Sequence, residues 1–355
     1  MKKTVSFFFA LLVLSSCQAI KPHDKSVTGS TIERHLRNVT QLTFEADNGE
    51  AYFSWDGKRI IFQSSRGGYA CDKIWTMSID GKDVRLVSPD HGAHTCSFFF
   101  PDGHIVFAST SRIPGACPPR PETPKGARYV WPLYPYNIYA ADADGAHQKR
   151  LTDNPKYDAE PIVSPDGKQI VFGSQREGNF DVYIMDADGT HVRRLTDRIG
   201  YNGGPWFSPD GKKIAWRAWY PETDAEKAMW RDCMEKNYIV AVPLDLWVMD
   251  ADGSNKSMIL HNGATNFAPS WHPDGKRLIF ASNMDDWHDD IKQYGHNFEL
   301  YLINIDGTGL ERITYNDVFD SFPMFSPDGR KLVWSSNRNP KKPHETDIFI
   351  AEWVD

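Results

Sequence analysis

The chain has 355 residues, of which 25% are charged and 13% aromatic, and its formal net charge is −7 at pH 7. This composition predicts a packed globular protein and argues against a disordered chain. The acidic balance also argues against nucleic acid as a partner, because a polyanion is repelled by a surface of net negative charge.

The first sixteen residues have the pattern of an export signal. Lys2 and Lys3 precede an apolar run over residues 5–14, which is too short to span a bilayer as a stable helix. The run ends in Leu-Ser-Ser-Cys at residues 14–17, which resembles the bacterial lipobox at all four positions. The resemblance implies that residues 1–16 are removed and that Cys17 is lipidated. Ordinary secretion is the alternative.

Residues 17–36 would then form a polar, lipidated tether. Acyl chains on Cys17 anchor a protein firmly, because each buried methylene contributes about 0.8 kcal/mol. Gln18 stands where the lipoprotein rule for the inner membrane requires Asp. The resemblance therefore implies a location on the periplasmic side of the outer membrane.

A repeated unit organises residues 37–355. Six turns of the Pro-Asp-Gly type recur, and their aspartates are Asp56, Asp102, Asp166, Asp210, Asp274 and Asp328. In each unit two apolar runs flank this turn, and in the first five units two more flank a second Asp-Gly turn. Asp-Gly between apolar runs is a strong hairpin signal, because Gly accepts a positive φ. Each unit is therefore predicted to be a four-stranded antiparallel sheet, with strands A to D in chain order.

Six such sheets bury both faces only when they are arranged radially, which predicts an all-β, six-bladed propeller. The last unit ends at its third strand, in residues 347–355. The segment RNVTQLT at residues 37–43 has the pattern of a fourth strand. We expect this N-terminal strand to complete the last blade, so that no blade keeps a free edge.

The repeats are similar to those of TolB-type β-propellers, which also occur in prolyl oligopeptidases and tricorn-like proteases. SPDGKQIVFGSQR at residues 164–176 and SPDGRKLVW at residues 326–334 match the pattern, whereas the first unit departs from it with Trp55 in place of proline. The resemblance covers about residues 37–355 and implies the fold. It leaves the function open, because this repeat serves many proteins.

Function is expected on the face that carries the B–C and D–A loops. The A–B and C–D turns are short, whereas long insertions fall in the B–C loops, at residues 113–137, 220–245 and 284–298. Loops on a rigid scaffold often carry binding sites. Pro221 and the acids after it predict a helix in the second insertion, with a face shared by Ala228, Trp230 and Met234.

Aromatic side chains are frequent in these insertions. They suit contact with a peptide, a glycan or a protein, and the candidates are Trp131, Tyr134, Tyr136, Tyr220, Trp230 and Trp287. The alternative is that these side chains pack the insertions onto the rim of the propeller.

A ring of polar residues is the second candidate binding site. It occupies six equivalent positions, seven residues before each turn proline or Trp55: Asn48, His94, Asp158, Asn202, Asn266 and Asp320. Glu50 and Glu160 follow two positions later. We expect these residues at the mouth of the central channel, where oxygen ligands suit Ca²⁺ or a hydroxyl-bearing ligand. Local capping of the strand starts is the alternative.

Arginines and cysteines form two further sets. The B strands end in Arg66, Arg112, Arg176 and Arg338, which are expected to brace neighbouring blades or to bind a ligand. An exported chain can form disulfides, and we expect one between Cys71 and Cys96, with Cys117 as the competitor for the pairing. His91 and His94 could bind a metal ion, but the spacing supplies no third ligand, and we assign no metal.

The sequence contains none of the common catalytic signatures: no Gly-x-Ser-x-Gly elbow, no His-Glu-x-x-His and no Walker loop. We therefore expect no cofactor and a lipid-anchored envelope module that binds a protein or peptide. The alternative is a lyase or hydrolase acting on a glycan or peptide at the channel mouth, because some TolB-like propellers are lyases. Asp158 and Glu160 would serve as acid–base groups only where the channel raises a pKa.

Overall fold

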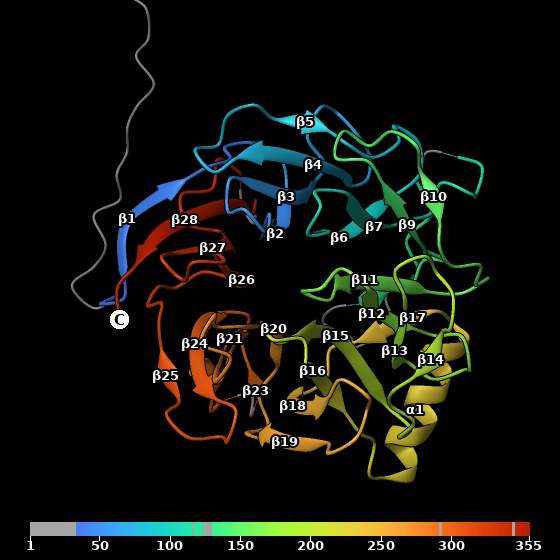
Figure 1. Ribbon diagram of the computed structural model, residues 1–355. Helices are drawn as coiled ribbons and strands as arrows, with labels where there is room; N and C mark the ends of the chain where they lie inside the picture. Colours follow the sequence, from blue (N-terminus) through green and yellow to red (C-terminus); the bar gives the residue numbers. More distant parts are fainter. Residues whose placement is uncertain (1–32, 116, 123, 125–129, 291–292, 343–344) are drawn as a thin grey trace, which may run out of the picture.

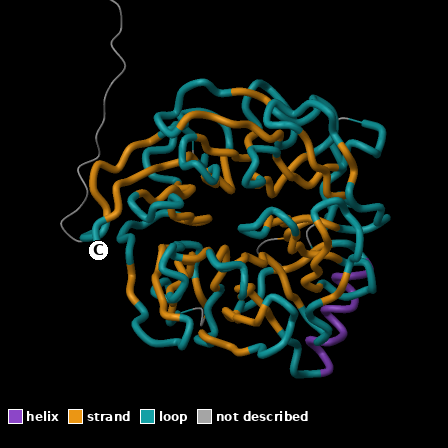
Figure 2. Tube along the Cα trace, viewed as in Figure 1, coloured by secondary structure: helices purple, strands orange, loops and turns teal. Residues whose placement is uncertain are grey.

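The computed structural model describes residues 33–355 except 116, 123, 125–129, 291–292 and 343–344 (Figure 1). Six four-stranded antiparallel sheets surround a central axis, which confirms the six-bladed β-propeller. Figure 2 shows that strands build the blades and that one helix lies at the outer edge. The predicted signal peptide and Cys17 lie outside the described residues. Among the described residues, no helix is both long enough and apolar enough to cross a membrane.

The first three blades contain these strands, from the axis outward. Blade 1 consists of β2 (Asn48–Phe53), β3 (Arg59–Ser64), β4 (Lys73–Ser78) and β5 (Arg85–Leu86). Blade 2 consists of β6 (His94–Phe99), β7 (Ile105–Ser109), β9 (Asn137–Ala141) and β10 (Lys149–Arg150). Blade 3 consists of β11 (Asp158–Val163), β12 (Gln169–Ser174), β13 (Asp181–Asp186) and β14 (Arg193–Arg194).

The other three blades follow the same order. Blade 4 consists of β15 (Tyr201–Phe207), β16 (Lys213–Trp219), β18 (Asp245–Asp250) and β19 (Ser257–Leu260). Blade 5 consists of β20 (Asn266–Trp271), β21 (Arg277–Ser282), β24 (Glu299–Asn304) and β25 (Glu311–Arg312). Blade 6 consists of β26 (Asp320–Phe325), β27 (Lys331–Ser336), β28 (Asp347–Trp353) and β1 (Leu36–Gln41).

The ring is closed by the N-terminal strand, as predicted. β1 runs antiparallel to β28, with Leu36 opposite Trp353 and Gln41 opposite Phe349. The two ends of the propeller therefore share blade 6, and β28 has a hydrogen-bonded neighbour on each side.

The repeated turns are structural. Ser164 Oγ donates to Asp166 Oδ1 over 2.6 Å, and the Lys168 amide donates to the same oxygen over 3.1 Å. The glycine of the second turn has another role, because a Cβ on Gly145 would overlap the carbonyl of Val87 in the preceding blade. The first turn closes its own hairpin, and the second lets neighbouring blades approach closely.

Each blade is packed around one aromatic side chain on its B strand. The six equivalent residues have no exposed surface, and they are Phe62, Phe107, Phe172, Trp216, Phe280 and Trp334. Burying one such side chain contributes about 1.5–3 kcal/mol. The repeated position therefore supplies a separate core for every blade.

The insertions add structure above the B–C face. α1 (Asp224–Glu235) begins at Thr223, whose side chain forms a capping box with Glu226. The helix buries Trp230, Cys233 and Met234, whereas Ala228 is exposed, so the prediction that Ala228 shares a face with Trp230 and Met234 was wrong. Residues three and four apart share a helix face, and Ala228 lies two residues from Trp230.

Two small sheets join the insertions. β8 (Val130–Pro132) from blade 2 pairs with β17 (Tyr238–Val240) from blade 4. β22 (Trp287–His288) pairs with β23 (Gln293–Tyr294) within the insertion of blade 5. The first pairing links the loops of two blades that are not neighbours in the ring.

Candidate functional site

Each A strand turns one residue toward the central channel at a β-bulge. In β2 the pairing register shifts between Gly49 and Tyr52, and the same irregularity recurs in the other five A strands. One bulge residue in each strand has a positive φ: Glu50, Cys96, Glu160, Gly204, Ala268 and Phe322. A residue in this conformation breaks the regular alternation of side chains. All six line one cavity, and we call them the floor.

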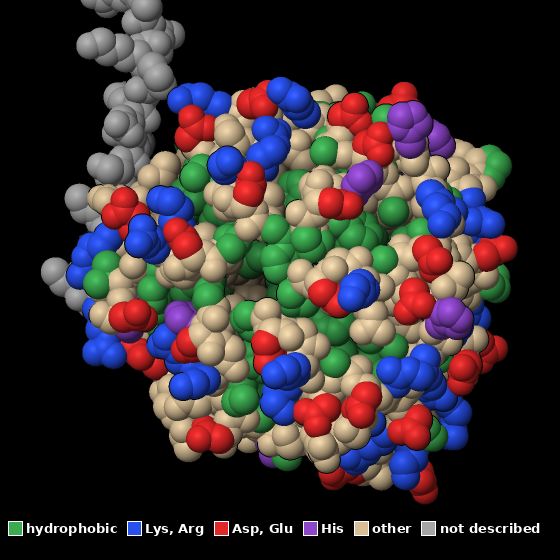
Figure 3. Space-filling model, in the orientation of Figure 1, with side chains coloured by type: hydrophobic (Ala, Val, Ile, Leu, Met, Phe, Trp, Pro, Cys, Tyr) green, Lys and Arg blue, Asp and Glu red, His purple; other side chains and the backbone are tan. Residues whose placement is uncertain are grey.

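The cavity has a volume of about 1240 Å³ and lies on the B–C face. Its walls come from the B–C loops of blades 2, 4, 5 and 6 and from the D–A loops of blades 4 and 5. Wall residues include Trp131, residues 239–244, residues 286–288 and residues 293–298. Figure 3 views the propeller along its axis and shows one face only, without labelling the cavity; on that face hydrophobic side chains surround the centre and most charged side chains lie toward the rim.

The predicted polar ring lies inside the blades. Its six members are at most 2% exposed and do not line the cavity. Asp158 shows the pattern: it accepts from Ser174 Oγ over 2.6 Å and from Arg176 Nη2 over 2.8 Å. The expectation that the ring lines the channel mouth was wrong, because the bulge turns the residue two positions later toward the channel instead. The two acids that follow the ring, Glu50 and Glu160, do line the cavity.

The arginines at the B-strand ends brace this ring within a blade. Arg66 donates to Asn48, and Arg338 donates to Asp320. Arg112 instead donates to the Asn154 carbonyl. The expectation that these arginines brace neighbouring blades was wrong for Arg66, Arg176 and Arg338, since each binds a ring residue of its own blade. None of the four lines the cavity.

An ion pair forms the polar side of the floor. Arg217 Nη2 lies 2.6 Å from Glu160 Oε1, and Arg217 Nε donates to the Tyr201 hydroxyl over 3.0 Å. The Gly204 amide donates to Glu160 Oε2 over 2.8 Å. Gly204 has no side chain, and a Cβ there would overlap the guanidinium of Arg217. Both oxygens of Glu160 are therefore satisfied by donors from blade 4.

Glu50 is the second carboxyl group of the floor, and its surroundings differ. It is 6% exposed, and its one hydrogen-bonding partner among the described residues is the Cys96 thiol, 3.6 Å from Oε1. Burial raises the pKa of Glu50 to about 7; the Cys96 contact acts against this shift, and the charge of Glu160 adds to it. Glu50 therefore changes charge near neutral pH.

Aromatic rings form the opposite side of the floor and the adjoining wall. Phe267 contacts Phe298, Phe319 and Phe322 in edge-on and stacked arrangements, with ring centroids 5.1 to 6.1 Å apart. Trp287 is 46% exposed at the rim. The cavity thus combines an acidic side with an aromatic side.

The aromatic candidates divide into two groups. Trp131 and Trp287 line the cavity, as a contact role requires. The other four lie outside it and pack the insertions onto the propeller: Tyr134, Tyr136, Tyr220 and Trp230. For example, the Tyr220 hydroxyl donates to Asn202 Oδ1 over 2.7 Å. The packing alternative therefore holds for four of the six.

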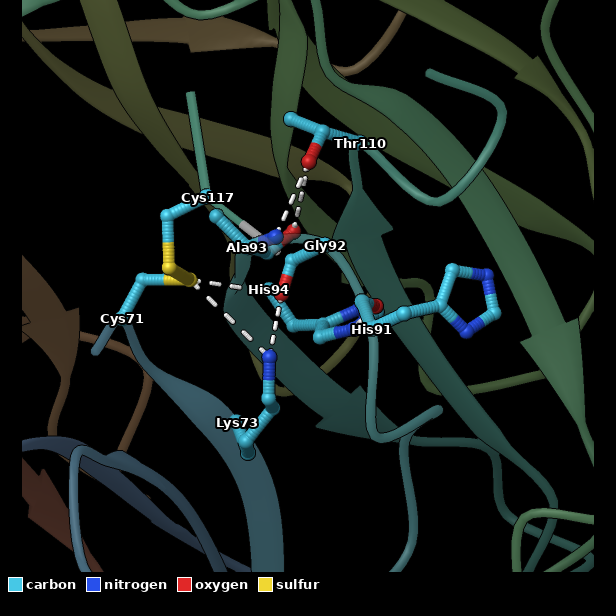
Figure 4. Close-up of a disulfide and its surroundings, with 8 residues drawn as sticks. All are labelled: Cys71, Lys73, His91, Gly92, Ala93, His94, Thr110 and Cys117. Atoms are coloured by element: carbon cyan, nitrogen blue, oxygen red, sulfur yellow. Dashed lines mark hydrogen bonds between the residues drawn. A yellow bond between two sulfur atoms is a disulfide. The ribbon is translucent and has the colours of Figure 1, made fainter. Parts of the chain in front are cut away.

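The disulfide joins Cys71 to Cys117, with a Cα–Cα distance of 5.9 Å, and this corrects the expected pairing with Cys96 (Figure 4). Cys71 and Cys117 lie in the B–C loops of neighbouring blades. Cys96 is a buried free thiol on the floor, because the bulge in β6 turns it toward Glu50. Beside the disulfide, the buried Lys73 amine donates to the Gly92 carbonyl.

Among the described residues, no group of three or more His, Cys, Asp or Glu could hold a metal ion. His94 Nε2 lies 2.9 Å from the His91 carbonyl, which fits a donated hydrogen bond, and the His91 ring is exposed. Burial lowers the pKa of His94 to about 4, so this imidazole is neutral at neutral pH.

Comparisons with known proteins agree with this geometry. Residues 124–230 match the TolB beta propeller domain family. The Tol-Pal system protein TolB of Alcanivorax borkumensis is 28% identical over 99 residues, which is 28% of this chain and 21% of that protein. The chain matches less than a third of the length of the first such curated relatives.

Solved structures share the fold. The TolB structure from Acinetobacter baumannii has a TM-score of 0.57 at 17% identity, over 84% of this chain and 64% of that one. An oligogalacturonate lyase in complex with manganese has a TM-score of 0.52 at 12% identity, over 89% of this chain and 93% of that one. Identities this low show the fold alone.

The six blades, the turn pattern and the sequence matches agree with one another. The chain is a six-bladed β-propeller that is similar to TolB-like propellers, with a match to the TolB beta propeller domain over residues 124–230.

Proposed function

We propose that this chain is a binding module of the cell envelope that receives an extended peptide segment of a partner protein. The observation that carries the proposal is the cavity of about 1240 Å³, whose walls are built from the inserted loops. Binding sites of this type are concave and largely apolar, with a few polar groups that fix orientation. The aromatic side and the carboxyl groups of the floor supply both kinds of contact.

The envelope setting is supported by the relatives and by the sequence of the first residues. Matched relatives are Tol-Pal system proteins, and residues 14–17 have the lipobox pattern. In this proposal Cys17 carries the lipid, and residues 18–32 connect it to the propeller at the periplasmic side of the outer membrane.

Replacing the lipidated cysteine tests the anchor. In Cys17→Ser, incorporation of labelled palmitate should be lost and the protein should move to the soluble fraction, because every buried methylene contributes about 0.8 kcal/mol to membrane binding. In Gln18→Asp, labelling should persist while the protein moves to inner-membrane fractions. Unchanged labelling of Cys17→Ser would contradict the anchor.

Site-specific photo-crosslinking tests the peptide-binding role. A benzoylphenylalanine at position 287, on the cavity rim, should form a covalent adduct with one envelope protein, and mass spectrometry should map the adduct to a single segment of it. The same probe at Lys168, an exposed turn residue on the opposite face, should not form this adduct. Equal adducts at the two positions would contradict binding in the cavity.

A further variant measures what the rim contributes. Trp287→Ala should weaken binding of the mapped segment roughly tenfold or more, because tryptophan is enriched among binding hot spots and its large apolar surface would be buried by the segment. Turnover of that segment, or of an envelope glycan, by the purified protein would instead support the alternative of a propeller enzyme. Glu50 would then be the first acid–base group to examine, since its pKa is raised to about 7.

A further inference from the structure

The cavity carries an excess of negative charge. Its described lining includes four carboxyl groups, Glu50, Glu160, Asp286 and Asp317, and one arginine, Arg217. His288 and His296 also line it. An apolar cavity with an excess of carboxylates lowers the energy of a cation inside it and raises that of an anion.

The four carboxyl groups are not equivalent. Glu160 is held by Arg217 and by the Gly204 amide. Asp286 accepts from the amide of Asn297 over 2.8 Å and lies 3.0 Å from His288 Nε2. Both of these groups therefore already have partners from the protein.

Glu50 is the buried carboxyl group that lacks a strong partner. Only the Cys96 thiol reaches Oε1, and no described donor reaches Oε2. Asp317 is exposed at the rim and is solvated by water instead. Burying a carboxylate without a hydrogen-bonding or charged partner costs free energy. A hydrogen-bond donor from a ligand therefore stabilises the complex more at Glu50 than at the other three carboxyl groups.

The aromatic side of the cavity restricts the kind of ligand that can bring a hydrogen-bond donor to Glu50. Phe267, Phe319 and Phe322 offer ring faces and edges but no hydrogen bonds. Aromatic rings attract cations and also bury aliphatic chains. A positively charged group on an apolar stem satisfies both sides of the cavity at once.

We propose that the floor of the cavity binds an ammonium or guanidinium group at Glu50, carried by a lysine or arginine side chain of the bound peptide. This inference rests on the proposed function and names the chemistry of its ligand. Glu160 and Arg217 hold the polar side of the floor in place, and the aromatic side packs against the apolar residues beside the basic one.

The charge state of Glu50 makes this binding depend on pH. The groups that face Glu50 are Cys96 from β6, Glu160 from β11, Arg217 from β16 and Asp72 from the B–C loop of blade 1. Burial raises the pKa of Asp72 to about 6, so Asp72 titrates partly in the same range. Between about pH 8 and about pH 6 the ionised fraction of a group with a pKa near 7 falls from roughly 0.9 to roughly 0.1.

Two matched peptides test the proposal by titration calorimetry with the purified propeller. One is acetyl-Leu-Arg-Phe-amide, and the other has citrulline, a neutral isostere, in place of arginine. At about pH 8 the arginine peptide should bind on the order of tenfold more tightly than the citrulline peptide, and at about pH 6 most of this preference should be lost.

Two variants locate the effect. Glu50→Gln should abolish the preference at both pH values, because its amide has nearly the same shape and no charge. Glu235→Gln removes the same unit of charge from an exposed position at the end of α1, outside the cavity, and should keep the preference. Equal affinities of the two peptides for the wild type, or an unchanged preference in Glu50→Gln, would each overturn the proposal. Absent binding of both peptides and of agmatine, the third ligand, would overturn it as well.

A third ligand separates this proposal from the proposed function. Agmatine carries a guanidinium group on a short aliphatic stem and has no peptide backbone. If agmatine binds in a Glu50-dependent way and neither tripeptide nor the crosslinked segment binds, the result supports the cation site and contradicts the peptide-binding role. If the crosslinked segment binds with equal affinity to wild type and Glu50→Gln, the result supports the peptide-binding role and contradicts the cation site.

Discussion

Arg338→Met is expected to destabilise the propeller by about 3–5 kcal/mol, because it leaves two buried carboxyl groups without their cation. Arg338 Nη2 lies 2.6 Å from Glu33 and 2.8 Å from Asp320, and the side chains of these acids are 4% and 0% exposed. Methionine fills a similar volume and removes only the charge and the hydrogen bonds. Chemical denaturation at neutral pH would measure the loss in the free energy of unfolding.

Equivalent arginines in other blades provide matched controls. Arg176 pairs with one buried carboxylate, Asp158, and Arg66 donates to a neutral amide, that of Asn48. The loss of stability should therefore be largest for Arg338→Met, smaller for Arg176→Met and smallest for Arg66→Met. Equal losses in the three variants would show that packing of the side-chain stem matters more than the buried charge.

Glu50→Gln is expected to stabilise the protein above pH 7 by up to about 3 kcal/mol, at 1.36 kcal/mol per unit of pKa shift. The pKa of Glu50 is about 7 in the folded protein and 4.5 in the reference state. The folded state therefore binds the proton more tightly, and the stability that Glu50 contributes is present below its unfolded pKa and is lost as the pH rises through 7. Glutamine stays neutral throughout.

The difference between wild type and Glu50→Gln should thus be large at about pH 8 and small at about pH 5, because the carboxyl group is protonated in the folded protein at the lower value. Denaturant midpoints at the two pH values measure it. The exposed variant Glu235→Gln should show little difference at either pH. A gain of stability in Glu50→Gln that does not change with pH would contradict the raised pKa.

The two Glu50 experiments together have a wider meaning. A residue that lowers stability at neutral pH, yet occupies the floor of a cavity, has the properties expected of a binding group. Glu50→Gln should therefore raise the free energy of unfolding and weaken ligand binding at the floor of the cavity.

The fold could be predicted from the sequence because its signals are local and repeated. Turn residues such as Asp166 and Gly167 mark every hairpin. Residues 37–43 resemble the other D strands closely enough that the pairing of β1 with β28 followed from the pattern. Each turn pattern is a weak signal by itself, but its recurrence in six units identifies the repeat of the propeller.

The site was predicted less well, because it depends on a backbone feature that the residue types do not reveal. In a regular strand Asn48 and Glu50 would lie on the same face. The bulge turns Glu50 to the channel and leaves Asn48 in the blade. Glycine is the usual signal for positive φ, but of the six bulge residues only Gly204 carries it. Glu50, Cys96 and Glu160 give no such sign.

Contacts between loops were the other feature that the sequence did not predict. The sequence offered Cys96 and Cys117 as partners for Cys71, but the choice between them depends on which Cβ atoms approach each other in space. The pairing of β8 with β17 joins insertions of blades 2 and 4 and has no local signal. Relations between distant segments of this kind cannot be read from periodicity.

The closure of blade 6 also has a mechanical consequence. Tension on the chain ahead of Glu33 would act first on the Glu33–Arg338 ion pair and then on the hydrogen bonds between β1 and β28. The polar groups of the floor, Glu50, Cys96, Glu160 and Arg217, belong to blades 1 to 4. A pull on the chain ahead of Glu33 would therefore load blade 6 first, and blade 1 with Glu50 is its neighbour in the ring. The load would reach Glu50 before the Glu160–Arg217 ion pair, which lies farther around the ring in blades 3 and 4.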